Sequence, residues 1–238
     1  MDFYNTSFYD KASADYSSKR YQDRPQSYVQ FFFKNRLYIL LKYINKLVKN
    51  KNDLKLLEIG CADGIVINSI INTFPHAFSR CVGTDISPNM IETAQKRNEH
   101  KNALYFLKNT GESGLYDIVL AVGFLSPGIF DEEFAYIKSH LKSDGVVIVS
   151  LASRKSAYTR IKLQYKDYIK DYWSHSQYRD FLEKDFQIID SKPYGLFIPK
   201  LWAFPTIARV IQPAVELIGS FFLSGLFHEK LYLLKRKS

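Results

Sequence analysis

Short apolar runs alternate with segments of helical spacing through most of the chain, and this alternation predicts the core of the fold. The apolar runs, which are typical of buried strands, cover 54–59, 81–84, 104–107, 117–122, 146–151, 186–190 and 231–234. The predicted helices cover 26–50, 65–74, 88–99, 132–141 and 177–184, the last capped by Ser176. Short apolar strands separated by helices predict an α/β fold with a parallel sheet covered on both faces.

The N-terminal part of the chain has a different pattern. Residues 1–25 are polar and rich in tyrosine, without a sustained period, and predict a loose arm. The helix over 26–50 carries basic residues between its apolar positions, namely Lys34, Lys42, Lys46 and Lys49. A solvated basic face explains them better than a nucleic-acid surface does. We therefore expect an arm and helix over 1–50, followed by the main domain over 51–238.

A second apolar helical segment, 199–227, interrupts the pattern before the last predicted strand. One helical stripe of this segment is apolar, consisting of Phe204, Ile207, Val210, Ile211, Ala214, Val215, Ile218, Phe221 and Phe222. Arg209, Gln212 and Glu216 supply the opposite side, and Pro213 interrupts the run, whereas a membrane span needs about 20 mostly apolar residues. The segment predicts a helical insertion that packs on the domain's own core, or one that serves as a lid or interfacial anchor. In the second case Lys200, Arg209 and the basic tail 235–237 would attract anionic lipid.

Composition narrows the class of protein without identifying it. The chain has 238 residues, 46% hydrophobic and 24% charged, which fits a globular protein and excludes a wholly disordered one. A formal charge of +9 favours an anionic neighbour, which is nucleic acid, a membrane surface or an acidic substrate. The two cysteines and the lack of a secretory signal predict a reducing, cytoplasmic setting, with contact to the membrane periphery through 199–227.

The most informative segment is LLEIGCADGIV, residues 56–66. A predicted strand ends in it, a glycine-bearing loop follows, and a predicted helix begins at Ile65. A loop at the carboxyl end of a strand, beside a helix N-terminus, is where open α/β sheets bind ligands. Asp85 ends the next predicted strand, and an acid about 20 residues beyond such a loop bonds the ribose hydroxyls of a nucleoside. Loop and acid together predict a nucleoside-containing ligand.

The residues of this loop discriminate between nucleoside ligands. A dinucleotide site has the pattern G-x-G-x-x-G, whereas this loop has Gly60, Ala62 and Ile65 at the three positions. Glu58 and Asp63 would also repel a pyrophosphate. A ligand with an amino group and a sulfonium tolerates both acids, which points to S-adenosyl-L-methionine (SAM).

On these motifs the sequence resembles the class I SAM-dependent methyltransferases, in particular those that act on small molecules. Glu58, Gly60 and Gly64 match the family's first motif, Ala62 departs from its commonest middle glycine, and Asp85 matches its ribose-binding acid. Further resemblances lie at 87–90, 116–121, 141–145 and 186–188. The resemblance implies a Rossmann-like seven-stranded sheet with helices on both faces, and SAM as the cofactor.

The resemblance also implies a set of site residues. The cofactor-binding residues are then Glu58, Gly60, Cys61, Ala62, Gly64, Asp85, Ile86, Met90, Asn109, Thr110 and Ala121. Ile86 would pack on the adenine, and Asn109 and Thr110 would lie near its amino group. The arm resembles the aromatic N-terminal lid that many relatives fold over the cofactor, here with Tyr4, Phe8, Tyr9 and Tyr16.

The methyl acceptor is less closely defined by the sequence. His175 lies in a region that commonly borders the acceptor pocket of this fold and is the candidate general base. The histidines and cysteines show no close ligand spacing, so no metal site is expected. We expect a small-molecule acceptor, hydrophobic or lipid-linked, with nucleic acid disfavoured. Two alternatives stay open. One is another enzyme with the SAM fold, such as an aminopropyltransferase, although its acidic polyamine site has no clear counterpart here. The other is an RNA-binding methyltransferase or a non-catalytic binding module with the SAM fold.

Overall fold

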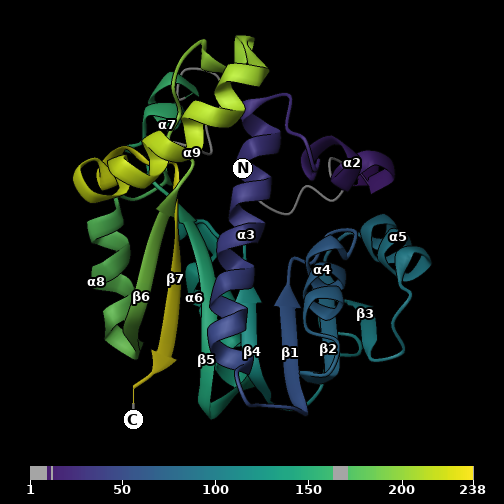
Figure 1. The fold of residues 1–238 in the computed structure, drawn as a ribbon. Coiled ribbons are helices and arrows are strands. Elements are labelled where there is room, and N and C mark those ends of the chain that lie inside the picture. Colours follow the sequence, from purple (N-terminus) through teal and green to yellow (C-terminus); the bar gives the residue numbers. More distant parts are fainter. Residues whose placement is uncertain (1–9, 12, 163–170, 238) are drawn as a thin grey trace.

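The computed structural model describes residues 10–11, 13–162 and 171–237 (Figure 1). The strands are β1 Leu54–Ile59, β2 Phe78–Asp85, β3 Ala103–Leu107, β4 Tyr116–Ala121, β5 Leu141–Ala152, β6 Phe186–Tyr194 and β7 Glu229–Arg236. The helices are α2 Tyr16–Arg20, α3 Tyr28–Val48, α4 Ile65–Thr73, α5 Pro88–Arg97, α6 Phe130–His140, α7 Ala157–Lys162, α8 His175–Asp185 and α9 Pro205–Phe222. Short 3-10 turns are η1 Ser13–Asp15, η2 Pro127–Ile129, η4 Leu201–Ala203 and η5 Ser224–Leu226. Every predicted strand is present.

The strands form one seven-stranded sheet in the order β3-β2-β1-β4-β5-β7-β6. Strands β1 to β5 pair in parallel, whereas β7 runs antiparallel to both β5 and β6. The predicted Rossmann-like seven-stranded sheet is therefore confirmed, although β7 departs from a fully parallel arrangement. The strand order reverses between β1 and β4, and ligands of open α/β sheets bind beyond the carboxyl ends of the strands at such a point.

Helices cover both faces of the sheet, as the apolar runs predict. Successive side chains of a strand point to opposite faces, so Leu56 packs on the side of α3, α4 and α5 while Leu57 packs on the side of α6 and α8. Both residues are fully buried. This double burial explains why the strand sequences are continuously apolar rather than alternating.

Helix α3 belongs to the core of the domain. Phe32, Leu40 and Ile44 are buried against the first face of the sheet. Its lysines point into solvent, as predicted, at Lys34, Lys42, Lys46 and Lys49. Residues 28–48 are therefore part of the same folded unit as the sheet, and the arm proper ends before Tyr28.

The predicted insertion before the last strand is present as α9 and its flanking turns. It connects the end of β6 to the start of β7, and Glu229 at the start of β7 pairs with Ala152 at the end of β5. Because β7 is antiparallel to β5, α9 lies at the carboxyl edge of the sheet, while the C-terminus lies at the opposite edge (Figure 1). The prediction that the basic tail shares a lipid-facing surface with α9 is therefore wrong.

Helix α8 begins earlier than the sequence predicts. Ser174, not Ser176, is the N-cap, because its Oγ accepts a hydrogen bond from Gln177 N at 3.4 Å. The Gln177 side chain in turn accepts from Ser174 N at 3.0 Å, which completes a capping box. Both serines lie just before the predicted helix over 177–184. The reciprocal hydrogen bonds between Ser174 and Gln177 identify Ser174 as the N-cap.

Ser174→Ala is therefore expected to destabilise the protein by about 1 kcal/mol, the usual effect of removing an N-cap side chain. Ser176→Ala is the matched control and should change stability by less than half as much. Urea unfolding followed by circular dichroism measures both. An equal effect of the two substitutions would contradict the assignment of the cap.

Candidate active site

The loop after β1 folds tightly around left-handed backbone. Gly60, Ala62 and Gly64 have φ angles of 70°, 48° and 77°. A Cβ at Gly60 would lie 2.7 Å from the ring of Phe124, and one at Gly64 would lie 2.9 Å from Tyr105. Both glycines are thus required by conformation and by space. Ala62 is a strained residue, because a left-handed alanine costs about 1–2 kcal/mol.

Asp85 ties this loop to the end of β2. Its Oδ2 accepts a hydrogen bond from Ala62 N at 2.9 Å, and its Oδ1 accepts from Ser87 N at 3.0 Å. Burial raises the pKa of the Asp85 carboxyl, and the two backbone donors oppose that shift. Each carboxylate oxygen has a further lone pair beyond its backbone partner, so Asp85 holds the loop and still offers acceptors to a ligand.

Glu58 is the second acid at this edge, and it is buried. Its side chain is 2% exposed, and Oε2 has no hydrogen-bond partner among the described residues. Burial raises its pKa well above the usual range, Arg36 opposes the shift, and Asp85 and Asp63 add to it. A buried carboxyl oxygen without a partner is costly, and it is the feature of this site that most clearly calls for a cationic ligand.

Arg36 reaches over the same edge from α3. It is 5% exposed, and its Nη2 donates to Tyr21 Oη at 2.9 Å. Gly123 makes room for it after β4, because a Cβ at this position, where φ is 91°, would lie 2.3 Å from Arg36 Nη1. The sequence analysis missed Arg36, although a signal exists: it lies one turn from Phe32 and from Leu40, on the apolar stripe of its helix.

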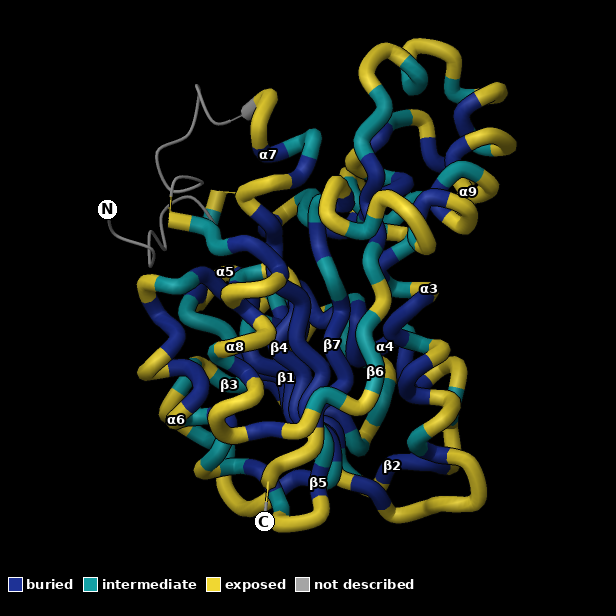
Figure 2. The backbone as a smooth tube through the Cα atoms, turned by 90° about the vertical axis from the view of Figure 1, so that its left-hand side faces the viewer, coloured by how far each residue is buried: buried dark blue, intermediate teal, exposed yellow. Residues whose placement is uncertain are grey.

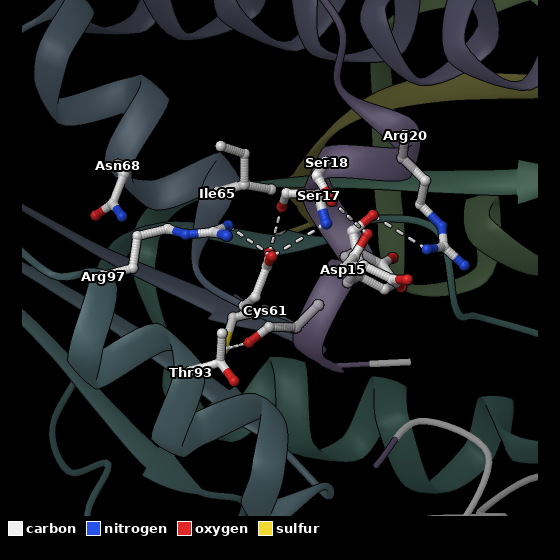
Figure 3. Close-up of polar contacts among 12 residues, drawn as sticks. Asp15, Ser17, Ser18, Arg20, Cys61, Ile65, Asn68, Thr93 and Arg97 are labelled. Atoms are coloured by element: carbon white, nitrogen blue, oxygen red, sulfur yellow. Dashed lines mark hydrogen bonds and ion pairs between the residues drawn. The ribbon is translucent and has the colours of Figure 1, made fainter. Parts of the chain in front are cut away.

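The N-terminal arm closes over this loop through a buried acid. Ser17 Oγ and N donate to the two oxygens of Asp63 at 2.6 and 3.1 Å, and Arg97 Nη1 donates to Asp63 Oδ2 at 2.6 Å. Figure 3 shows Ser17 and Arg97 on opposite sides of these contacts, which are drawn as dashed lines. Asp10 also accepts a hydrogen bond from Ser87 Oγ. The arm is thus fastened to both ligand-binding loops.

The predicted lid residues divide into two groups. Tyr16 is half-buried on α2, with Arg20 placed over its ring at 4.0 Å from the centroid. Tyr4, Phe8 and Tyr9 lie outside the described residues.

A hollow of about 330 Å³ lies beyond β2 and β3. Its lining includes three of the predicted cofactor residues and consists of Ile86, Leu107, Lys108, Asn109, Thr110 and Glu132. A larger hollow of about 440 Å³ lies at the amino ends of β1 and β2, among residues 48–52 and 74–77, and shares no residue with the loops described above. The first hollow is therefore the one that extends the site formed by the β1 and β2 loops.

Three of the predicted cofactor residues point their side chains into the core. Cys61 packs against Gly83, where a Cβ would lie 2.9 Å from its Sγ. Met90 and Ala121 are also buried, and none of the three lines the hollow of about 330 Å³. Their side chains form part of the core beneath the site. The Cys61 backbone N–H donates a hydrogen bond to Thr84 O at 2.9 Å.

His175 and the neighbouring His228 have different surroundings. His175 is 9% exposed, its Nδ1 lies 3.5 Å from Tyr232 Oη, and burial lowers its pKa to about 3. A group with that pKa accepts protons poorly near neutral pH, so the geometry gives no support to His175 as a general base. His228, which sequence reasoning left unassigned, lies beside Phe32 and Tyr158, with ring centroids 5.4 and 4.7 Å away.

The next feature is the arrangement of potential metal ligands in the described part of the chain. No group of three or more histidine, cysteine, aspartate or glutamate side chains there is arranged to hold a metal ion. The acids at the carboxyl edge instead surround the β1 loop together with Arg36 and Arg97.

A seven-stranded sheet of this order, with a glycine-bearing loop after β1 and an acid at the end of β2, defines the class I SAM-dependent methyltransferases. A family model described as a methyltransferase domain matches residues 32–187, more than half of the chain. The chain therefore belongs to this methyltransferase domain family.

Two curated proteins show related sequence. The hybrid PKS-NRPS synthetase lepA of Aspergillus flavus is 30% identical over 136 residues, which are 50% of this chain and 3% of that protein. The malonyl-[acyl-carrier protein] O-methyltransferase of Bacillus anthracis is 25% identical over 138 residues, which are 56% of this chain and 51% of that protein. The matched regions thus span about half of one relative and a small part of the other.

Solved structures extend the similarity over nearly the whole chain. The magnesium protoporphyrin IX methyltransferase ChlM of Synechocystis, with bound SAH, aligns at a TM-score of 0.66 and 14% identity, over 98% of this chain and 97% of that one. The plantazolicin methyltransferase BpumL, with SAH, aligns at a TM-score of 0.59 and 18% identity, over 99% and 93%. At these identities the likeness shows the shared fold.

Asp63→Asn is expected to loosen the arm. An amide forms weaker bonds to Ser17 and Arg97 than a carboxylate does, and a loss of about 1.5 kcal/mol makes arm opening roughly tenfold more frequent. In limited trypsin digestion, more frequent opening of the arm should appear as faster cleavage after Lys19 and Arg20. Asp15→Asn is the control, because the Asp15 carboxylate pairs with the exposed Lys19 and not with Ser17 or Arg97. Equal cleavage rates in the two variants would show that Asp63 does not hold the arm.

Proposed function

We propose that this protein transfers the methyl group of SAM to a small hydrophobic molecule, free or lipid-linked. The observation that best supports binding of SAM is the buried Oε2 of Glu58, which has no hydrogen-bond partner among the described residues and lies beside the loop held by Asp85. Support for the acceptor side comes from the aromatic residues next to this edge and from the names of the similar proteins, which are methyltransferases of malonyl-[acyl-carrier protein], plantazolicin and magnesium protoporphyrin IX.

The residues of the site suit the distinct parts of the donor. Glu58 offers a carboxyl oxygen to the amino group of the methionine part, and Arg36 offers a guanidinium to its carboxylate. Asp85 suits the ribose hydroxyls, and the hollow lined by Ile86, Asn109 and Thr110 suits the adenine. Gly60, Ala62 and Gly64 allow the backbone to approach the ligand closely.

The chemistry requires little from the protein beyond alignment. When bound, SAM supplies a methyl carbon that its sulfonium has already activated for in-line displacement. The loops after β1 and β2 hold one reactant in place, and the arm bonded to Asp63 excludes water from that side. An acceptor with an ionisable hydroxyl or amine also needs a group that accepts its proton.

An aromatic wall supplies the surroundings of the acceptor. Tyr28, Phe32, Tyr158, Phe197 and His228 contact one another, with ring centroids 4.7 to 6.2 Å apart. His228 immediately precedes Glu229, which pairs with the carboxyl end of β5, so the wall stands at the same edge as the cofactor loops. Aromatic side chains packed beside the cofactor loops suit a hydrophobic acceptor.

Incubation with labelled SAM and fractionated extracts tests the function. We expect the label in the lipid or apolar small-molecule fraction. Label in the RNA fraction, with an affinity that falls steeply with salt, would replace the proposal with the RNA-binding alternative. SAM binding without labelling of any fraction would favour the non-catalytic module.

Glu58→Gln separates cofactor binding from folding. A carboxyl whose pKa is raised on folding stabilises the protein fully only below its unfolded pKa, and this contribution is lost as pH rises toward the folded pKa. At neutral pH the substitution should therefore raise the melting temperature of the cofactor-free protein by a few degrees, at ~2–4 °C per kcal/mol.

The same substitution should weaken SAM binding at least tenfold in calorimetric titration, since it removes a charge-assisted bond of about 1.5–3 kcal/mol. Glu99→Gln is the control, because Glu99 is exposed on the segment after α5. Unchanged SAM affinity in Glu58→Gln would remove Glu58 from the cofactor site, whatever its effect on melting.

His228→Gln tests the acceptor side. Burial lowers the pKa of His228 below its ordinary value of 6.5, so the imidazole is neutral and able to accept a proton at neutral pH. With an acceptor found by labelling, the rate should fall by about 10²–10⁴, and the loss of rate expected of the native protein at acidic pH, where this imidazole is protonated, should disappear. SAM affinity should stay unchanged. A full rate in this variant would exclude His228 as the proton acceptor.

A further inference from the structure

Helix α9 turns its polar side inward and its apolar side outward. Gln212 and Glu216 are 0% and 7% exposed, whereas Val210, Phe221 and Phe222 are 75%, 77% and 83% exposed. Figure 2 shows the same alternation, with short buried stretches between exposed ones along α9. A surface helix normally has the opposite arrangement. The expectation that the stripe packs on the domain's own core is therefore wrong.

Buried hydrogen bonds hold the helix in this orientation. Glu216 Oε1 accepts from Leu196 N at 2.9 Å and from Gln212 Nε2 at 3.1 Å, and Glu216 Oε2 accepts from Asn35 Nδ2 at 2.6 Å. Gln212 Nε2 also donates to Leu196 O, and Trp202 Nε1 donates to Gln212 Oε1 at 3.3 Å. Rolling the helix to bury its apolar side would leave these groups without partners. The outward apolar face is thus a fixed feature of the fold.

The exposed charges of the segment that carries this face have one sign. Between Gly195 and Phe227 the charged residues are Lys200, Arg209 and Glu216. Glu216 is buried, Lys200 is exposed and Arg209 is half-buried, so the outer surface of this segment carries positive charge and no carboxylate. Large exposed apolar side chains beside basic residues are the combination that binds an anionic bilayer surface.

We propose that this apolar face is a docking surface for an anionic lipid bilayer, which the protein binds without crossing it. The face consists of Phe204, Ile207, Val210, Ile211, Leu217, Ile218, Phe221 and Phe222, each more than 40% exposed. No helix of the described residues is long and apolar enough to span a membrane. A second copy of the chain fits less well, because each copy carries +9 and would bring like charge to the contact.

The position of α9 gives this surface a use. Helix α9 lies at the carboxyl edge of the sheet, and Arg209 Nη1 donates to Pro25 O at 3.0 Å, which joins it to the segment between the arm and α3. A bilayer bound to α9 would therefore lie at the same edge of the sheet as the aromatic wall. The inference rests on the proposed function only in that a lipid-linked acceptor would approach from this side.

Vesicle co-sedimentation with the full chain tests the proposal. The native protein should bind vesicles of phosphatidylcholine with about a third phosphatidylglycerol, and bind pure phosphatidylcholine at least several-fold more weakly. Phe221→Ser with Phe222→Ser should weaken binding at least tenfold. The matched control is Leu104→Ser with Leu115→Ser, two residues that are 38% and 50% exposed away from α9. Lys200→Glu should weaken binding to the anionic vesicles alone.

SAM titration and melting temperature are measured for every variant. Neither should change for Phe221→Ser with Phe222→Ser, since the two side chains are 77% and 83% exposed. A failure of the proposed function would appear in SAM binding or labelling and leave vesicle binding intact. Absence of vesicle binding by the native protein would overturn the inference. So would a concentration-dependent dimer that Phe221→Ser with Phe222→Ser converts to a monomer while vesicles stay unbound, because a second copy would then cover the face.

Discussion

The placement of three carboxyl side chains, two of them buried, at one edge of the sheet is the constraint on which the rest of the site depends. Glu58 lies near the end of β1, Asp63 on the loop after it and Asp85 at the end of β2. Burial raises the pKa of Glu58, and the two neighbouring acids add to the shift. Charges in such surroundings must be paired or bonded. Arg36 arrives from α3 and Arg97 from α5, and backbone donors of the β1 loop complete the set. The N-terminal elements are thus bound to the sheet by charge as well as by apolar packing.

This excess of acid has a consequence for turnover under the proposed function. The donor brings a sulfonium charge to an edge where Glu58 and Asp85 are only partly compensated, whereas the product that remains after transfer is an uncharged thioether. At a low effective dielectric a unit of charge is worth several kcal/mol at short range. The same carboxylates that cost stability in the ligand-free protein therefore favour binding of the donor over retention of its product.

Sequence reasoning reached the parts of the site that local geometry fixes. Gly60 and Gly64 are required by left-handed backbone angles, and Asp85 stands where a strand must end, so each leaves a signal within its own segment. Arg36 interrupts the apolar stripe of its own helix, but its role depends on α3 lying beside the loop after β4. The role of His228 depends on β7 returning beside β5. The seven strands were predictable from their apolar runs for the same local reason, while the antiparallel direction of β7 was not.

The orientation of helix α9 could not be predicted from the hydrophobic pattern of its sequence. Helical period tells which side chains share a face, but the direction in which that face points depends on what the rest of the molecule offers. Here the loop after β6 presents the backbone N–H and C=O of Leu196, and Gln212 and Glu216 satisfy both. Leaving buried polar groups unpaired costs about 1–3 kcal/mol each, whereas turning this side outward would expose the loop. The fold therefore keeps its polar contacts and leaves the apolar face in water, a state whose cost of about 25 cal/mol per Å² is relieved only by a partner that covers it.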